Sequence, residues 1–216
     1  MKKIFLSILA MASMAMTANA QLWFGGGISF SHNGGVTKTN GADDVDKPSS
    51  NSFSFSPTVG FDLSEKLAVG GKLNFLSTTG KQTNGNTETK TSDFMFGITP
   101  FARYKFVEFN KFGILAEAGA PISHRSHKND NGSTTTKGDP TMSVGLYVEP
   151  VLTYSLNDHF QLECGLDFMS FNATHSVTKD RDDSSNKDIN NYFRFGASTY
   201  NVVTISNITI GFIYKL

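Results

Sequence analysis

Charged side chains recur at alternate positions within the apolar stretches of this sequence, and their chemistry is considered first. Cations and carboxylates that share one face of a sheet form ion pairs, and rings of such charges tune ion selectivity in channels. Buried charges are too costly to stand alone, so a salt-bridged network that holds the structure together is the simpler interpretation. The residues expected in this inward-facing charge network are Lys72, Arg103, Glu117, Glu149, Glu163 and Asp167.

Metal binding is the next chemistry to weigh. His124-x-x-His127 followed by Asp130 offers imidazole and carboxylate ligands, but no regular secondary-structure spacing supports a site. The acidic runs at 43–46 and 180–183 offer oxygen ligands for calcium, which needs several of them. Neither run follows an EF-hand pattern, and solvated acidic loops are the simpler interpretation. We therefore expect no bound metal and no cofactor.

The elements that must position these residues are strands. Alternation with a period of two dominates from residue 22 onward, as expected for strands with one apolar face. Short connections between the strands alternate with long polar ones. This alternation is typical of a transmembrane meander, in which tight turns lie on one side of the membrane and long connections on the other. Both chain ends then lie on the same side, which requires an even number of strands. The eight predicted strands cover 22–30, 53–63, 67–77, 92–106, 112–122, 142–156, 160–170 and 207–216.

Within these strands, charged residues have the opposite parity from aliphatic and aromatic residues. Phe94 and Phe96 share one face of their strand, for example, whereas Arg103 falls on the other. A lysine or arginine that faces lipid near the middle of a membrane costs about 2–4 kcal/mol. A soluble sandwich also alternates but buries its apolar face; long strands with aromatic residues at both ends favour the membrane. The sequence predicts an all-β fold, an eight-stranded antiparallel up-and-down transmembrane β-barrel after an N-terminal signal peptide.

The N-terminus has the three parts of a secretory signal peptide. Lys2 and Lys3 precede an apolar run at 4–16, and Ala18-Asn19-Ala20 forms a cleavage site. The apolar run is too short to span a bilayer as a helix. We expect a signal peptide at 1–20, cleavage after Ala20, passage through the inner membrane, and a barrel domain at 21–216.

Composition excludes several classes of function. The chain has 19 basic and 19 acidic residues, and the two lysines in the first 20 residues leave 17 against 19 afterwards. No basic stripe is present, so we expect no nucleic-acid partner. Cys164 is the single cysteine, which excludes an internal disulfide and a zinc site built on thiolates.

The C-terminus carries the most specific motif. The segment 209–216 has the spacing polar-x-Gly-x-x-apolar-x-apolar and ends on the last residue, with Thr209, Gly211, Tyr214 and Leu216 in the defining positions. It is similar to the signal that barrel-assembly machinery recognises, except that Leu216 replaces the commoner terminal Phe. With Leu22-Trp23-Phe24-Gly25-Gly26-Gly27 and the hairpin at 61–70, the chain resembles the outer membrane protein β-barrel domain family, within the OmpA/OmpW-like superfamily. The resemblance implies the bacterial outer membrane as location. It also implies barrel-assembly machinery, outer-membrane lipid and lipopolysaccharide as partners.

Function follows less directly, because a fold does not specify an activity. We expect a non-enzymatic protein with a structural or surface-recognition role through long polar loops, chiefly 31–52, 123–141 and 171–206; within the last, alternation at 192–198 indicates an extended hairpin. One alternative is a narrow channel for small or amphipathic solutes, as in the OmpW branch. Another is a lipid A-modifying enzyme. Deacylases of that kind carry a His-x-Ser pair, which His124-Arg125-Ser126 matches. They also need a Glu further along the chain, and none appears between this pair and Glu149, which lies on the inward face of the next strand.

Overall fold

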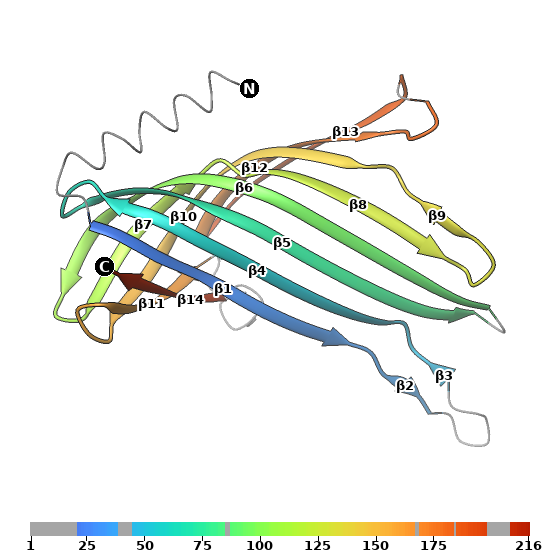
Figure 1. The fold of residues 1–216 in the computed structure, drawn as a ribbon, viewed down its shortest axis with the longest axis horizontal. Coiled ribbons are helices and arrows are strands. Elements are labelled where there is room, and N and C mark those ends of the chain that lie inside the picture. The colour runs from blue at the N-terminus through green and yellow to red at the C-terminus, as the bar shows by residue number, and fades with distance from the viewer. Residues whose placement is uncertain (1–20, 39–44, 85–86, 167–168, 184, 198–207) are drawn as a thin grey trace.

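The computed structural model describes residues 21–38, 45–84, 87–166, 169–183, 185–197 and 208–216 (Figure 1). The predicted signal peptide at 1–20 lies outside these residues. Regular structure in the described residues is all β, in one twelve-stranded antiparallel sheet and a small separate hairpin, β2–β3. The strands are β1 (Gln21–Asn33), β2 (Val36–Thr37), β3 (Val45–Asp46), β4 (Ser49–Asp62), β5 (Leu67–Asn84), β6 (Thr87–Phe109), β7 (Phe112–Gly119), β8 (Ile122–Asp130), β9 (Thr135–Lys137), β10 (Thr141–Ser155), β11 (Phe160–Leu166), β12 (Met169–Lys179), β13 (Lys187–Ala197) and β14 (Ile208–Lys215).

Eight of these strands close into a ring at the end that carries the short turns. The ladders run from β1 through β4, β5, β6, β7, β10, β11 and β14, and back to β1. The closing ladder joins the two ends of the barrel domain, with Trp23 opposite Lys215. The Leu216 N–H also donates to the Leu22 carbonyl at 3.1 Å. The predicted closed eight-stranded antiparallel barrel is therefore confirmed.

Short turns at this end are fixed by local hydrogen bonds. Between β10 and β11, the Asn157 side-chain oxygen accepts from the N–H groups of His159 and Phe160, at 2.9 and 2.7 Å. Between β6 and β7, Asn110 has a φ of 53°, a left-handed conformation that asparagine adopts more readily than most residues. Turns of this kind hold neighbouring strands in one register, and the register decides which side chains meet in the interior.

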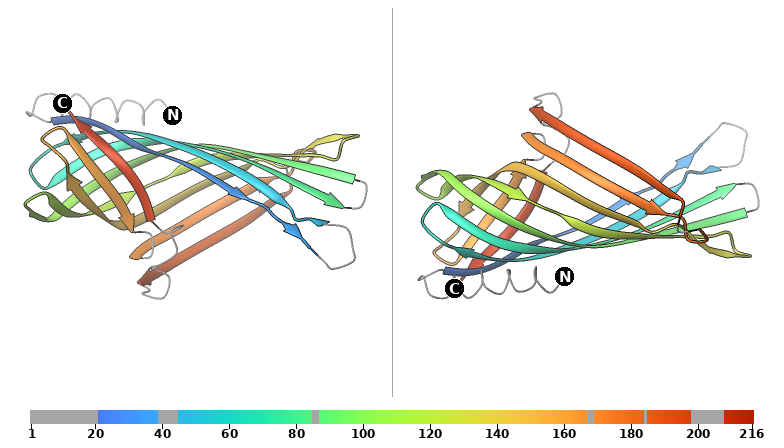
Figure 2. Two further views of the ribbon diagram at one scale, coloured as in Figure 1. Left: turned by 90° about the horizontal axis from the view of Figure 1, so that it is seen from below. Right: turned by 90° about the horizontal axis from the view of Figure 1, so that it is seen from above.

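Beyond the ring, the strands continue as long hairpins. β5 and β6 stay paired from Leu67–Tyr104 out to Asn84–Thr87. β8 succeeds β7 and lies between β6 and β10. β12 and β13 pair along their whole length as a hairpin (Figure 2), and β12 also pairs with β10 from Val148–Phe171 to Thr141–Thr178. In the part of the chain that the structure describes, no ladder joins β13 to β1.

These hairpins correct the prediction of long loops. The sequence predicted polar loops at 31–52, 78–91, 123–141 and 171–206, but most of the described residues in these stretches are strands. Only the alternation at 192–198 had indicated a hairpin in advance. Strands outside a bilayer can be wet on both faces, so their sequences carry many polar residues and resemble loop sequences.

The apolar face of the ring points outward. Ile98 and Leu152 are 43 % and 40 % exposed, whereas Arg103 and Glu117, on the opposite parity, are 6 % and 0 % exposed. A soluble sandwich would show the reverse arrangement. Among the described residues, no helix has the length and apolar character needed to cross a membrane.

Candidate functional site

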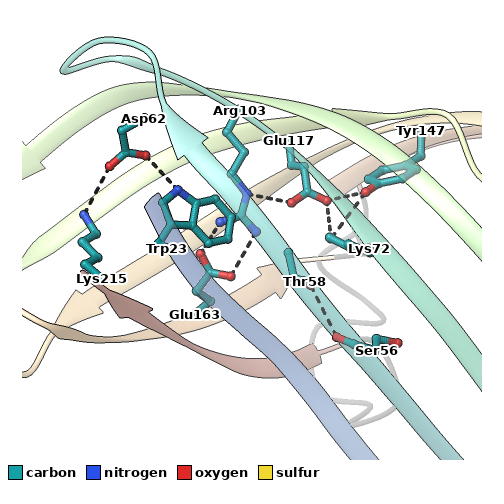
Figure 3. Close-up of polar contacts among 10 residues, drawn as sticks. All are labelled: Trp23, Ser56, Thr58, Asp62, Lys72, Arg103, Glu117, Tyr147, Glu163 and Lys215. Carbon is teal, nitrogen blue, oxygen red and sulfur yellow. Dashed lines mark hydrogen bonds and ion pairs between the residues drawn. The ribbon is translucent and has the colours of Figure 1, made fainter. Parts of the chain in front are cut away.

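The interior of the ring is filled by polar side chains from five strands that converge at one height (Figure 3). Lys72 lies on β5, Arg103 on β6, Glu117 on β7, Tyr147 on β10 and Glu163 on β11. Register brings them together, since Arg103 is directly opposite Glu117 in the β6–β7 ladder. The interior of an eight-stranded barrel is only wide enough for side chains to fill, so groups at the same height must contact one another.

Arg103 is the centre of this cluster. Its Nε donates to Glu117 Oε2 at 2.8 Å, and its two terminal nitrogens donate to the two oxygens of Glu163 at 2.6 and 3.0 Å. The paired contacts to Glu163 form the bidentate arrangement in which arginine binds carboxylates most strongly. The guanidinium carbon also lies 4.8 Å from the Trp23 ring centroid and 4.9 Å from that of Phe101, which adds cation–π attraction.

Glu117 joins a second cation to the cluster. Besides Arg103, it contacts the Lys72 ammonium in an ion pair and accepts a hydrogen bond from the Tyr147 hydroxyl. Lys72 Nζ lies 5.3 Å from the Phe101 ring centroid. Two cations thus face two carboxylates. Every buried side-chain polar atom among the described residues has a hydrogen-bond partner, which is the condition under which buried charges are tolerated.

Trp23 fills the ring next to Arg103, toward the short turns. Its indole N–H donates to Asp62 Oδ1 at 2.9 Å, and the other Asp62 oxygen lies 3.8 Å from Lys215 Nζ. The indole occupies the space over Gly60, where a Cβ atom would come within 2.1 Å of Trp23 Cζ2. The same arrangement, an aromatic ring over a glycine on a paired strand, recurs for Phe101 with Gly70 and for Tyr147 with Gly119.

Three aromatic members of this site were not predicted from the sequence: Trp23, Phe101 and Tyr147. Their inward parity was visible, but aromatic residues favour strands on either face. The glycine opposite each ring is the signal that identifies them. A glycine within a strand marks a place where another group approaches closely.

Of the six residues predicted for the charge network, the structure brings four together. Lys72, Arg103, Glu117 and Glu163 are in direct contact. Glu149 is half-buried and lies opposite Glu117 in the β7–β10 ladder. Asp167 lies outside the described residues.

The residues of the predicted assembly signal lie at the closing seam. Thr209, Gly211 and Tyr214 pair with β11, and Leu216 follows the end of β14. The Tyr214 ring packs against that of Phe160, with centroids 5.0 Å apart. Both rings lie near the short turns, where interfacial aromatic residues are concentrated in membrane proteins.

The structure separates the histidines that the sequence had grouped. His124 has outward parity on β8, opposite Phe96, and Ser126 shares its face. His127 has the opposite parity, and its Nδ1 lies 3.1 Å from Asp93 Oδ1. Within the described ranges, no group of three or more His, Cys, Asp and Glu residues is placed to hold a metal ion.

A closed antiparallel ring with apolar side chains outside and paired charges inside defines a transmembrane β-barrel. The sequence matches the family described as "Outer membrane protein beta-barrel domain" over residues 4–151, and the chain belongs to this family. It is a bacterial outer-membrane β-barrel protein.

Solved barrel structures are similar to this chain at low sequence identity. Neisserial surface protein A (NspA) is 14 % identical, with 91 % of this chain and 96 % of that chain covered and a TM-score of 0.36. A major outer membrane protein from Thermus thermophilus is 13 % identical, with coverages of 92 % and 100 % and a TM-score of 0.47. Ail, the attachment invasion locus protein of Yersinia pestis, is 11 % identical, with coverages of 91 % and 97 % and a TM-score of 0.39. No curated protein sequence matches the chain.

Proposed function

We propose that this protein is a non-enzymatic outer-membrane barrel with a closed lumen, which presents its long hairpins outside the cell for a structural or surface-recognition role. The short turns then face the periplasm. The observation that carries the proposal is the ion-pair network of Lys72, Arg103, Glu117 and Glu163, which fills the ring at one height.

The network supports a closed lumen because its charges are matched and buried. Arg103 and Glu117 are both almost inaccessible to solvent. A charge that tunes conduction in a channel must be able to exchange its partner for a passing ion. Here each exchange would break at least one ion pair in a low-dielectric interior, which costs several kcal/mol. A narrow channel is the competing function, and it requires this network to open.

The surroundings of the His-x-Ser pair support a non-enzymatic role. A hydrolase triad needs a carboxylate to orient the histidine. The cross-strand neighbours of His124 are Phe96 on β6 and Met142 on β10, neither of which is acidic. The direct test is Ser126→Ala in the native membrane. Lipid A composition should be the same as with the wild-type protein; a change would show that the protein acts on lipid.

The polar hairpins support a recognition role. Their inward faces are joined by hydroxyl pairs across neighbouring strands, such as Ser52 with Thr78 at 2.9 Å and Ser143 with Ser176 at 2.8 Å. Such ladders hold the hairpins in register and leave the outer face and the tips for contact. Recognition residues are commonly carried by exposed segments on a rigid scaffold.

Conductance in planar bilayers tests the closed lumen. We expect rare, small openings for the wild-type protein and more frequent openings for Arg103→Ala, which removes the centre of the network. Ser133→Ala, at an exposed hairpin tip, is the matched control and should behave as the wild type does. Steady conduction by the wild-type protein would contradict the closed lumen and support the channel.

Orientation is tested separately in whole cells. Single cysteines are placed at Ser133 in a hairpin tip and at Asp158 in a short turn, in a Cys164→Ser background. A membrane-impermeant maleimide should label position 133 in intact cells and position 158 only after the cells are broken. The opposite pattern would place the hairpins in the periplasm and refute the recognition role.

A further inference from the structure

Four lysines lie side by side on the outward face of neighbouring hairpin strands. Lys81 on β5 is directly opposite Lys90 on β6, and Lys128 on β8 is directly opposite Lys137 on β9. Lys128 is also opposite Ser92, two residues from Lys90, so the two pairs occupy adjacent rows of one surface. The Lys81 and Lys90 side chains are 52 % and 66 % exposed. We refer to these four residues as the lysine row.

The height of the lysine row corresponds to the edge of the apolar surface. Phe94 is the last outward aromatic residue on β6 in this direction and is 49 % exposed. Ser92 and Lys90 follow it on the same face. At about 3.3 Å per residue, they lie about 7 and 13 Å farther along the strand. A lipid chain that covers Phe94 therefore has its headgroup at the level of the lysine row.

The surface at this level is hollowed. A depression of 390 Å³ is lined by Lys81, Lys90 and Lys128, together with the hydroxyl-bearing residues Thr79 and Ser92 and the carboxylate of Asp130. Ammonium groups and hydroxyls are donors, which suits an anion with several oxygen acceptors. Lysine in particular binds phosphate as a compact point charge.

The pairing of the lysines also points to an anion. Like charges directly opposite each other in an antiparallel ladder destabilise the sheet, and this hairpin surface carries two such pairs. Glu88 relieves one of them, with ion pairs of 2.6 Å to Lys81 and 3.1 Å to Lys90. Within the described residues, Lys128 and Lys137 form no ion pair that offsets their repulsion.

We propose that the lysine row binds the phosphate groups of a lipid headgroup in the outer leaflet. A phosphorylated headgroup offers several negative oxygens at the height where the lysines lie, and its acyl chains continue onto the apolar face that includes Phe94. The proposal rests on the outward orientation of the hairpins given above. It goes beyond that orientation in naming a binding site and the chemistry of its ligand.

The test measures lipid binding by the purified, folded barrel in neutral detergent micelles. The protein is titrated with diphosphorylated lipid A, and the bound fraction is determined by native mass spectrometry. The triple variant Lys81→Gln/Lys90→Gln/Lys128→Gln should bind on the order of a hundredfold more weakly, because each lysine near an anionic lipid contributes about a fivefold factor. The matched control is Lys66→Gln/Lys105→Gln/Lys111→Gln, which removes three lysines near the short turns and should bind within twofold of the wild type.

Two further titrations, with other ligands, identify the chemistry of the ligand. Lipid A stripped of its phosphates should bind the wild type and the triple variant equally weakly, and inorganic phosphate alone should bind far more weakly than the lipid. If the triple variant fails to fold, Lys128→Gln/Lys137→Gln takes its place, with an expected loss of about thirtyfold. Equal binding by the lysine variants and the control would overturn the proposal. Equal affinity for inorganic phosphate would replace the lipid site by a free-anion site. Because the titration is done in micelles, its outcome is independent of the orientation measured in cells.

Discussion

The ring and the hairpins are built from the same alternating strands, but their inward faces have different surroundings. In the ring, the inward face carries Arg103 and Glu117, which are 6 % and 0 % exposed and share ion pairs. In the hairpins, the corresponding face of β6 and β8 carries Asp93 and Arg125, whose side chains are 22 % and 53 % exposed at a separation of 3.3 Å. The same pair of charge types is thus shielded from solvent in the ring and accessible to solvent in the hairpins.

This difference assigns separate roles to the two regions. A buried pair that loses one partner leaves an uncompensated charge, so the ring accepts few substitutions. An exposed pair contributes little, because water and salt replace the lost partner. The ring therefore determines the stability of the barrel. The surface residues of the hairpins can change at little cost in stability. Lipid or surface recognition is expected where such change is tolerated.

Glu117→Gln compared with Asp93→Asn gives the largest expected contrast. Glu117→Gln leaves Arg103 and Lys72 facing a neutral side chain and should lower the free energy of unfolding by about 3–5 kcal/mol. Asp93→Asn removes the carboxylate that pairs with Arg125 and contacts His127, but at a partly exposed site, and should cost less than about 1 kcal/mol. The measurement is urea-induced unfolding in lipid vesicles, followed by Trp23 fluorescence. Similar losses of unfolding free energy in the two variants would mean that the interior of the ring is as accessible to water as the hairpins are.

The next comparison concerns the outward face. Ile98 lies between the two levels of outward aromatic residues and is opposite Leu73 and Ile122, so Ile98→Arg places a charge near the middle of the bilayer. The expected cost is about 2–4 kcal/mol. Ile189→Arg, on β13 in the far hairpin, should have almost no effect. Both are measured as unfolding free energies in vesicles, and a large loss for Ile189→Arg would mean that this hairpin is also embedded in lipid.

The same division explains what could be predicted from the sequence. Alternation located the ring strands and placed Arg103 and Glu117 on the inward face, because a charge on the lipid face is costly enough to leave a clear pattern. Of the β12–β13 hairpin, only the alternation at 192–198 was predicted, and the rest was assigned to a loop. Outward residues have even numbers in β11, such as Leu162, whereas Phe171 has outward parity in β12 because it is opposite Val148. Because the outward residues change from even to odd numbers between β11 and β12, the alternation does not continue from one strand into the next and is harder to recognise in the sequence.

The identity of the partners inside the ring could not be predicted for a different reason. Each strand's parity shows which way Tyr147 and Lys72 point, but their contact with Glu117 depends on the register of three separate ladders. Register is set by turn geometry and by packing between strands. A one-residue change in any of these ladders would have produced a different set of ion pairs from the same pattern.

Packing of glycine against aromatic rings gives a smaller effect. Gly60→Ala places a Cβ atom where the Trp23 ring lies and should destabilise the barrel by about 1–3 kcal/mol through overpacking. Gly71→Ala is the matched control, because a Cβ atom there meets nothing within 4 Å. It should be neutral or slightly stabilising. Thermal gel-shift midpoints of the two variants measure the difference, and equal midpoints would show that the indole moves aside freely.

The smallest effect is expected in the hairpins, from the protonation of Glu88. Hydrogen bonds from Lys81 first, and from Lys90 second, hold the pKa of Glu88 below its ordinary value. A lowered pKa in the folded state means that the ionised carboxylate stabilises the β5–β6 hairpin above the ordinary glutamate pKa. This stabilisation is lost as the pH falls through the lowered pKa. Carbon-detected NMR titration should therefore give a lower midpoint for Glu88 in the wild-type protein than in the Lys81→Gln/Lys90→Gln variant. Because Glu88 is exposed, the unfolding transition of the ring should not change over the same pH range. Equal Glu88 midpoints in the two proteins would show that the lysines do not hold the carboxylate. A shift of the ring's transition would show that the two regions are coupled.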